Sequence, residues 1–194
     1  IALERARTAR EAIDVIVNLA NTYGYYSSGE SFSIADKNEA WVMDLIGKGP
    51  DNKGIVWVAR RIPDGYICAH ANQARISTFP PNDPENCIYA PDVISFAREK
   101  GYFSGEDKDF SGMRACEARA WSAFNILCDG KFTFEDENGN LVTKSSYDYI
   151  EYAMGYDKTK RFPLFVKPSR KLSIKDVADV MRDHYEGTPM DMTV

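Results

Sequence analysis

Four polar side chains follow one another closely in the first half of the chain: His70, Asn72, Gln73 and Arg75. Residues 66–72 alternate as a β-strand does, and a strand that runs from apolar packing into donors and acceptors often delivers them to a cleft. An asparagine amide at such a strand end can hold an oxyanion or a substrate amide in a hydrolase. These residue types therefore favour a binding or hydrolytic site around Asn72, although the other three could equally support the strand end by hydrogen bonding.

A second arrangement with chemical potential is the pair of Cys68 and His70. Because they are two positions apart on the predicted strand, they share a face, which makes a cysteine–histidine nucleophile pair geometrically feasible. Same-face neighbours usually lie too far apart for proton transfer, so we favour a core role for Cys68. The other cysteines, Cys87, Cys116 and Cys128, are unevenly spaced without a CxxC pair, which predicts buried thiols rather than a zinc site or a disulfide framework.

The remaining candidates are His184 and Arg114. His184 lies near the end of a predicted C-terminal helix, where the helix dipole favours its protonated form, and we interpret it as a partly exposed residue. Arg114 could form an i, i+3 surface pair with Glu117 or, if buried, could bind a carboxylate bidentately. The chain has no HExxH spacing, P-loop, GxGxxG motif or GxSxG motif, so no metal or cofactor is predicted.

Composition sets the class of protein. The 194 residues are 44% hydrophobic and 12% aromatic, which is enough for one sizeable core, with or without an appended lobe. The formal net charge of -5 argues against non-specific nucleic-acid binding, and no apolar run approaches the ~20 residues that cross a bilayer. The chain starts at Ile1 without an initiator Met or a signal peptide and reads as the interior of a helical region. We therefore expect a processed product, a fragment or the ordered part of a longer protein.

The first half is predicted to be a helix followed by an antiparallel meander. Thr8 and Glu11 fit a capping box that opens a helix over residues 9–23, and Gly24 is a plausible stop. Strands are predicted at residues 31–35, 40–46, 55–60 and 66–72. A helix ahead of such strands favours a helix-on-sheet layer.

The second half is predicted to be mostly helical. The expected elements are a helix from Pro91 toward Lys100, a helix over 113–127, a hairpin over 131–143, and a last helix from a capping box at 173–176 to Gly187. Together the two halves predict the α+β class.

Two neighbouring segments, Val56–Asp64 and Ala69–Ile76, resemble the central signature of the dipeptidase A family, which are N-terminal-nucleophile cysteine peptidases related to the secernins. The resemblance runs in order over nearly the whole chain. Its supporting segments are Thr8–Ile13, Gly29–Asp36, Glu39–Asp44, Tyr89–Val93 with Phe96–Ala97, Pro168–Ser173 and Met181–Pro189.

The resemblance implies an αββα sandwich that cleaves dipeptides. It implies a cysteine at the mature N-terminus, whose thiolate attacks the peptide carbonyl while its own α-amine, with a pKa near ~7.7–8.0, serves as the base. By motif and strand position, Asn72 matches the asparagine that contacts the reacting amide or its oxyanion. His70, Gln73, Arg75 and Arg114 are the candidate substrate-binding residues, with Arg114 as the contact for a substrate carboxylate.

The chain also departs from the family. Residue 1 is Ile and the first cysteine is Cys68, so we expect the nucleophile and the first strands upstream, and an inactive isolated chain. Residues 1–194 are predicted to form one peptidase domain, incomplete at its N-terminal end and also at its C-terminal end, with a candidate break near 111–112. The expected partners are a dipeptide substrate and the upstream segment of the same protein, and the sequence also allows a homo-oligomer. The alternatives are a secernin-like binding or regulatory protein and an inactive proteolytic fragment.

Overall fold

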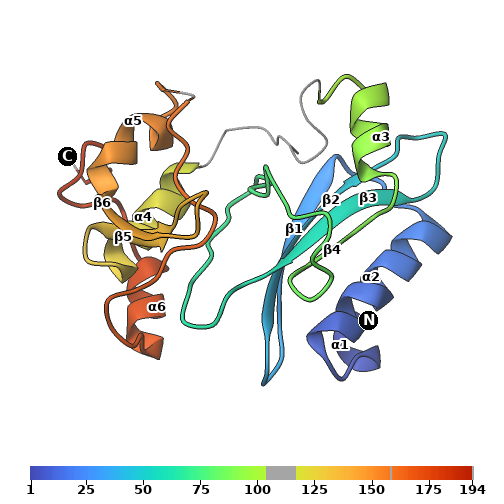
Figure 1. Cartoon of the computed structure of the whole chain (residues 1–194), viewed down its shortest axis with the longest axis horizontal. Coiled ribbons are helices and arrows are strands. Elements are labelled where there is room, and N and C mark those ends of the chain that lie inside the picture. The colour runs from blue at the N-terminus through green and yellow to red at the C-terminus, as the bar shows by residue number, and fades with distance from the viewer. Residues whose placement is uncertain (104–116, 158, 194) are drawn as a thin grey trace. The chain divides into compact units, whose positions relative to one another are not determined.

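The computed structural model describes residues 1–103, 117–157 and 159–193 (Figure 1). The chain divides into two compact units. The first contains residues 1–62 together with the described residues from 72 to 103, and the second contains residues 63–71 together with the described residues from 117 onward. Each unit has its own hydrophobic cluster, and the candidate break at 111–112 lies outside the described residues.

The first unit begins with a short helix, α1 (Ala2–Arg5), and continues into the predicted amphipathic helix, α2 (Ala9–Tyr23). Thr8 caps α2 by accepting a hydrogen bond from the backbone N–H of Glu11 at 3.2 Å. The Glu11 carboxylate accepts from the backbone N–H of Arg7 at 2.7 Å rather than from Thr8, so the predicted capping box forms in one direction only.

An antiparallel sheet follows α2, with strands in the order β1 (Gly29–Ala35), β2 (Ala40–Gly47), β3 (Ile55–Arg61) and β4 (Cys87–Tyr89). The prediction of a meander is confirmed, but the prediction that residues 66–72 form its fourth strand is wrong. These residues instead make an isolated bridge between Ile67 and Val166 in the second unit, and β4 pairs with β3 in their place.

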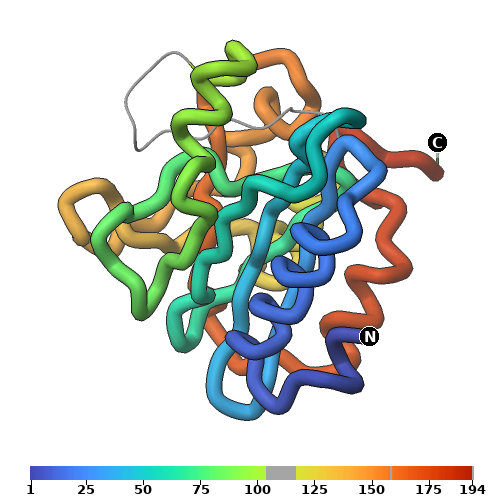
Figure 2. Tube along the Cα trace, turned by 90° about the vertical axis from the view of Figure 1, so that its right-hand side faces the viewer, coloured from blue at the N-terminus to red at the C-terminus, as the bar shows by residue number. Residues whose placement is uncertain are grey.

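Helix α2 covers one face of this sheet (Figures 1 and 2). Trp41, Met43 and Leu45 of β2 are buried in one cluster with Ala9 and Ile13 of α2. Because side chains alternate along a strand, residues 42, 44 and 46 point to the opposite face. That face carries the candidate site described below.

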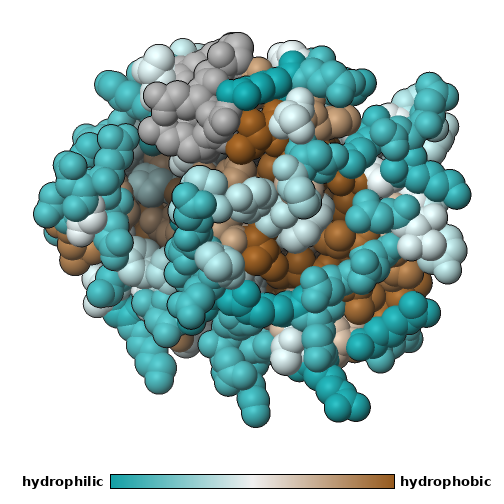
Figure 3. Space-filling model, turned by 45° about the vertical axis from the view of Figure 1, so that its right-hand side comes forward, coloured by the Kyte–Doolittle hydropathy of each residue, from teal (hydrophilic) through white to brown (hydrophobic). Residues whose placement is uncertain are grey.

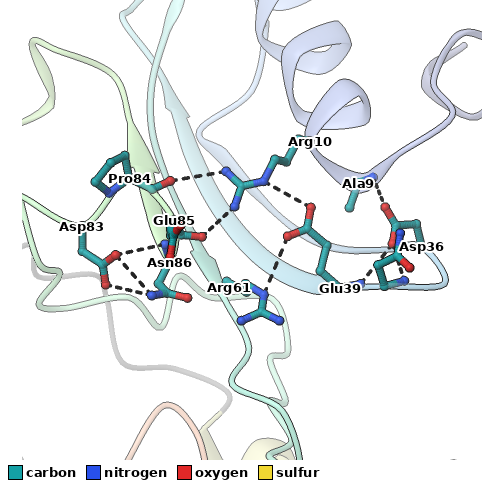
Figure 4. A network of polar contacts seen from close by, with 10 residues as sticks. Ala9, Arg10, Asp36, Glu39, Arg61, Asp83, Pro84, Glu85 and Asn86 are labelled. Carbon is teal, nitrogen blue, oxygen red and sulfur yellow. Dashed lines mark hydrogen bonds and ion pairs between the residues drawn. The ribbon is translucent and has the colours of Figure 1, made fainter.

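A polar network braces the same sheet at its edge (Figure 4). The Arg10 guanidinium donates to the carbonyl oxygens of Pro84 at 3.3 Å and Glu85 at 2.6 Å, and its Nε lies 3.2 Å from the Glu39 carboxylate. Arg61 of β3 approaches the other Glu39 oxygen at 3.7 Å. The start of α2, the turn before β2, strand β3 and the segment before β4 are thereby joined by side-chain contacts.

Helix α3 (Val93–Glu99) completes the first unit and buries Val93, Phe96 and Ala97. It begins two residues later than predicted. The backbone N–H of Val93 donates to the carbonyl of Ala90, so Pro91 belongs to a turn that precedes the helix.

The second unit is built on an aromatic cluster. Its elements are α4 (Glu117–Leu127), β5 (Lys131–Glu135), β6 (Leu141–Ser145), the 3-10 helix η1 (Ser146–Tyr149), α5 (Ile150–Ala153) and α6 (Ile174–Val180). Phe124, Phe132, Tyr149 and Phe162 pack with ring centroids 5.7–6.4 Å apart. The predicted hairpin is confirmed, since β5 and β6 pair antiparallel.

Helix α6 opens with the predicted capping box. Ser173 accepts from the backbone N–H of Asp176, and the Asp176 carboxylate accepts from the backbone N–H of Ser173 at 2.6 Å. The helix ends at Val180 rather than near Gly187, because the backbone turns there and Tyr185 takes a left-handed conformation with φ of 64°.

The predicted α+β class is confirmed by the antiparallel sheets and the helices. Within the described residues, no helix has both the length and the apolar character that a membrane span needs. Hydrophilic residues make up most of the protruding surface in Figure 3, and hydrophobic residues show mainly between them.

Candidate functional site

Asn72 lies at a bend in the backbone, where its φ is 47°. Asparagine tolerates this left-handed region better than most residues, and non-glycine residues in it are worth attention as functional positions. The side chain is exposed, and within the described part of the chain it makes no hydrogen bond. Its amide can therefore donate to a ligand from a fixed backbone bend.

Gln73, the next residue, has the opposite environment. It is only 8% exposed, and both its Nε2 and its Oε1 are buried without a hydrogen-bond partner among the described residues. Its backbone carbonyl lies 3.4 Å from the hydroxyl of Ser31. The alternative to substrate binding was that Gln73 supports the backbone by hydrogen bonding. Among the described residues the Gln73 amide makes no such hydrogen bond.

Arg75 is 2% exposed, and its backbone N–H donates to the carboxylate of Asp44 at 2.9 Å. The N–H of Ile76 donates to the same oxygen, Oδ2, also at 2.9 Å. The other carboxylate oxygen, Oδ1, accepts from the hydroxyl of Ser31 at 2.5 Å. Asp44 thus receives three hydrogen bonds and connects two strands to the segment that follows Asn72.

Asp44 was not singled out from the sequence. The one signal was a lone acidic residue inside the apolar run Ala40–Ile46. A carboxylate in a buried strand must be compensated by hydrogen bonds or by an opposite charge, so such a residue marks a polar contact even where the partner is unknown. Its 2% exposure puts it among the few buried charged residues of the described chain.

The structure divides the predicted site residues. Asn72, Gln73 and Arg75 belong to the first unit, whereas half-buried His70 belongs to the second. Arg114 lies outside the described residues. Three of the five candidates therefore lie on one short segment of the first unit, with Asn72 exposed and Gln73 and Arg75 buried.

The described cysteines differ in burial. Cys87 and Cys128 are each 2% exposed, as predicted for core residues, and burial raises the pKa of each thiol to about 11. Because the thiolate is the reactive form, neither has the environment of a nucleophile at neutral pH. Cys68 is half-buried in the second unit, and Cys116 lies outside the described residues.

His184 is exposed, as predicted, with a side chain that is 62% accessible. It lies beyond the last turn of the helix rather than within it, because α6 ends at Val180. Its neighbour is the Glu186 carboxylate, 3.4 Å from Nδ1. Across the described residues, no cluster of three or more His, Cys, Asp or Glu side chains could hold a metal ion.

Comparison with known proteins finds relatives that are similar in sequence to this chain. The chain is 26% identical over 194 residues to a probable dipeptidase of Salmonella dublin, covering 98% of this chain and 40% of that protein. It is 26% identical over 198 residues to a dipeptidase of Bifidobacterium longum, covering 98% of this chain and 35% of the relative. It is 27% identical over 207 residues to probable dipeptidase A of Streptococcus pyogenes serotype M1, covering 98% of this chain and 37% of that protein.

The chain therefore spans 35–40% of the length of these relatives. The model of peptidase family C69 matches residues 1–194, the whole of this sequence. The antiparallel sheets and helices are consistent with the α+β fold of N-terminal-nucleophile enzymes that the sequence resemblance implied. The chain belongs to peptidase family C69.

Proposed function

We propose that the complete protein containing this sequence is a cysteine-type dipeptidase. The observation that carries the proposal is the match of residues 1–194 to peptidase family C69, together with relatives that are named dipeptidases. The exposed amide of Asn72 supports it independently, because a donor on a fixed bend can hold the oxygen that becomes charged during acyl transfer.

The nucleophile in this proposal is a cysteine at the mature N-terminus of the complete protein. Its thiolate attacks the peptide carbonyl, its own α-amine accepts the thiol proton, and Asn72 donates to the resulting oxyanion. The burial of Cys87 and Cys128 supports a nucleophile elsewhere, since a pKa of about 11 leaves little thiolate at neutral pH. Gln73, Arg75, His70 and Arg114 are the proposed substrate contacts.

The test uses the complete protein and a panel of dipeptides. Asn72→Ala is expected to lower kcat about 100- to 1000-fold, which is the effect of removing one oxyanion donor. The matched control is Asn52→Ala, another exposed asparagine in the first unit, which leaves kcat at the wild-type value. Full turnover by Asn72→Ala would remove Asn72 from the mechanism, and failure of the wild type to cleave any dipeptide would overturn the proposed activity.

A thiol reagent separates the internal cysteines from the nucleophile. Iodoacetamide is expected to abolish hydrolysis by the wild type and equally by the Cys87→Ala, Cys128→Ala double variant. If the double variant stays active but becomes resistant, the reagent acts at one of these two buried thiols, and if the folded double variant is inactive, one of them is the nucleophile. A folded protein that binds dipeptides without cleaving them would favour the secernin-like binding role.

A further inference from the structure

Asp44 is an unusual residue for its position. It lies in the middle of β2, on the face that also carries buried Val42 and the β3 residue Val58, its partner across the sheet. A carboxylate there is destabilising unless other groups compensate its lost hydration. The three hydrogen bonds from Ser31, Arg75 and Ile76 provide that compensation.

Those bonds connect the sheet to a segment without regular structure. Residues 73–77 belong to no strand or helix, so their backbone N–H and C=O groups lack the regular hydrogen bonds of a sheet or helix. Asp44 takes two of their N–H groups, and Ser31, which pairs directly with Asp44 across β1 and β2, also reaches the Gln73 carbonyl. Asp44 and Ser31 therefore fix the backbone at Gln73, Arg75 and Ile76.

This anchoring matters because Asn72 is the residue immediately before the fixed segment. Asn72 itself is exposed and held at a φ of 47°, and the direction of its amide depends on the backbone that follows it. In an enzyme, a displacement of a reacting or stabilising group by about 1 Å can lower the rate about 100-fold. The anchor under residues 73–76 is thus placed to control the effectiveness of Asn72.

We propose that Asp44, supported by Ser31, is a positioning residue that holds the Asn72 amide in its productive direction for peptide hydrolysis. This inference rests on the proposed dipeptidase function. Asp44 does not touch the substrate and acts through the backbone of residues 73–76. Its removal is therefore expected to reduce turnover much more than substrate binding.

The main test measures kcat and KM of the complete protein with Asp44→Ala, which removes all three hydrogen bonds to the carboxylate. The expected result is a fall in kcat of about 100-fold with little change in KM. Amide hydrogen exchange supplies a readout that does not depend on activity: Arg75 and Ile76 exchange faster in Asp44→Ala than in the wild type, whereas residues of α2 do not.

The matched control is Asp36→Ala in the same unit. The Asp36 carboxylate also accepts backbone N–H groups, from Ala9 at 2.8 Å and from Asn38 and Glu39 at 2.6 and 3.0 Å, but none from residues 73–76. The substitution therefore loosens the start of α2 and leaves kcat at the wild-type value. Equal losses of kcat in both variants would reduce the role of Asp44 to general stability and overturn the proposal.

Ser31 supplies a second pair of variants in case Asp44→Ala does not fold. Ser31→Ala removes the hydroxyl and is expected to lower kcat about tenfold, whereas Ser31→Thr keeps the hydroxyl in a β-compatible side chain and restores most of the activity. Wild-type kcat in folded Ser31→Ala, or in folded Asp44→Ala, overturns the positioning role while the dipeptidase activity stands. A wild-type protein that cleaves no dipeptide overturns the proposed function and this inference together.

Discussion

Asp44 in β2 and Asp176 in α6 both accept backbone N–H groups through their carboxylates, but Asp44 is buried and bonds to distant residues, whereas Asp176 is half-buried and bonds to a near neighbour. Asp176 accepts from Ser173, three residues away, and also pairs with Arg170 at 2.8 Å near the surface. Asp44 is buried and accepts from residues 31 and 32 positions further along the chain. Water can replace the partners of Asp176, but it cannot easily reach the groups that Asp44 satisfies.

The same type of hydrogen bond, from a backbone N–H to a carboxylate, therefore has two different structural effects. At Asp176 the bond begins a helix, and its effect stays within one turn. At Asp44 it attaches an irregular segment to a sheet, so its effect extends to whatever that segment carries. The predictions below test whether burial and separation set the size of the effect.

The largest effect is expected from Asp44→Ala. It leaves the N–H groups of Arg75 and Ile76 buried without an acceptor, and each such group costs about 1–3 kcal/mol. The free energy of unfolding should therefore fall by about 2–6 kcal/mol in a urea titration. Ser173→Ala removes a helix cap and should lower the free energy of unfolding by about 1 kcal/mol. If Asp44→Ala lowers it by no more than this, the two regions do not differ in the way described.

A gain in stability is expected from Gln73→Leu in the same buried segment. Its amide is buried without a partner in the described part of the chain, so an apolar side chain of similar size should raise the free energy of unfolding by about 1 kcal/mol. Asn52→Leu, at a hydrated position, serves as the control and brings no gain. If Gln73 contacts the substrate, the more stable Gln73→Leu variant has a higher KM.

The smallest effect is the acid response of α6. Hydrogen bonds from Arg170 and Ser173 hold the pKa of Asp176 well below its ordinary value of 3.8. A lowered carboxyl pKa adds stability that is complete above the unfolded value and is lost as pH falls toward the folded one. The protection of the α6 amides, measured against the intrinsic exchange rate at the same pH, should therefore stay high at pH 5 and fall only below about pH 3.8. Ser173→Ala serves as the reference, since it exchanges faster at both pH values.

Local signals predicted much of the fold. The bounds of α2 follow from Thr8 and Gly24, and the capping box at Ser173 and Asp176 marks the start of α6. Each of these signals involves residues within a few positions of one another, where side-chain chemistry and backbone conformation are directly coupled.

Tertiary contacts account for what could not be predicted. Residues 66–72 alternate like a strand, yet their backbone finds its partner at Val166, and the short strand β4 (Cys87–Tyr89) has no distinct pattern of its own. At the site, the family resemblance predicted Asn72. The left-handed bend at Asn72 and the anchor at Asp44 were not predicted, because Asp44 bonds to residues more than 30 positions away. The periodicity of the sequence does not predict such a contact.

The bridge between Ile67 and Val166 has a consequence for the order in which the chain folds during synthesis. Ile67 leaves the ribosome about 100 residues before its partner, a delay of about 5–20 s at ordinary elongation rates. The sheet of the first unit can pair during that time, while residues 63–71 wait with apolar Ile67 and Ala69 exposed. Nascent chains stalled before Val166 should therefore offer this segment to chaperones, and longer ones should not.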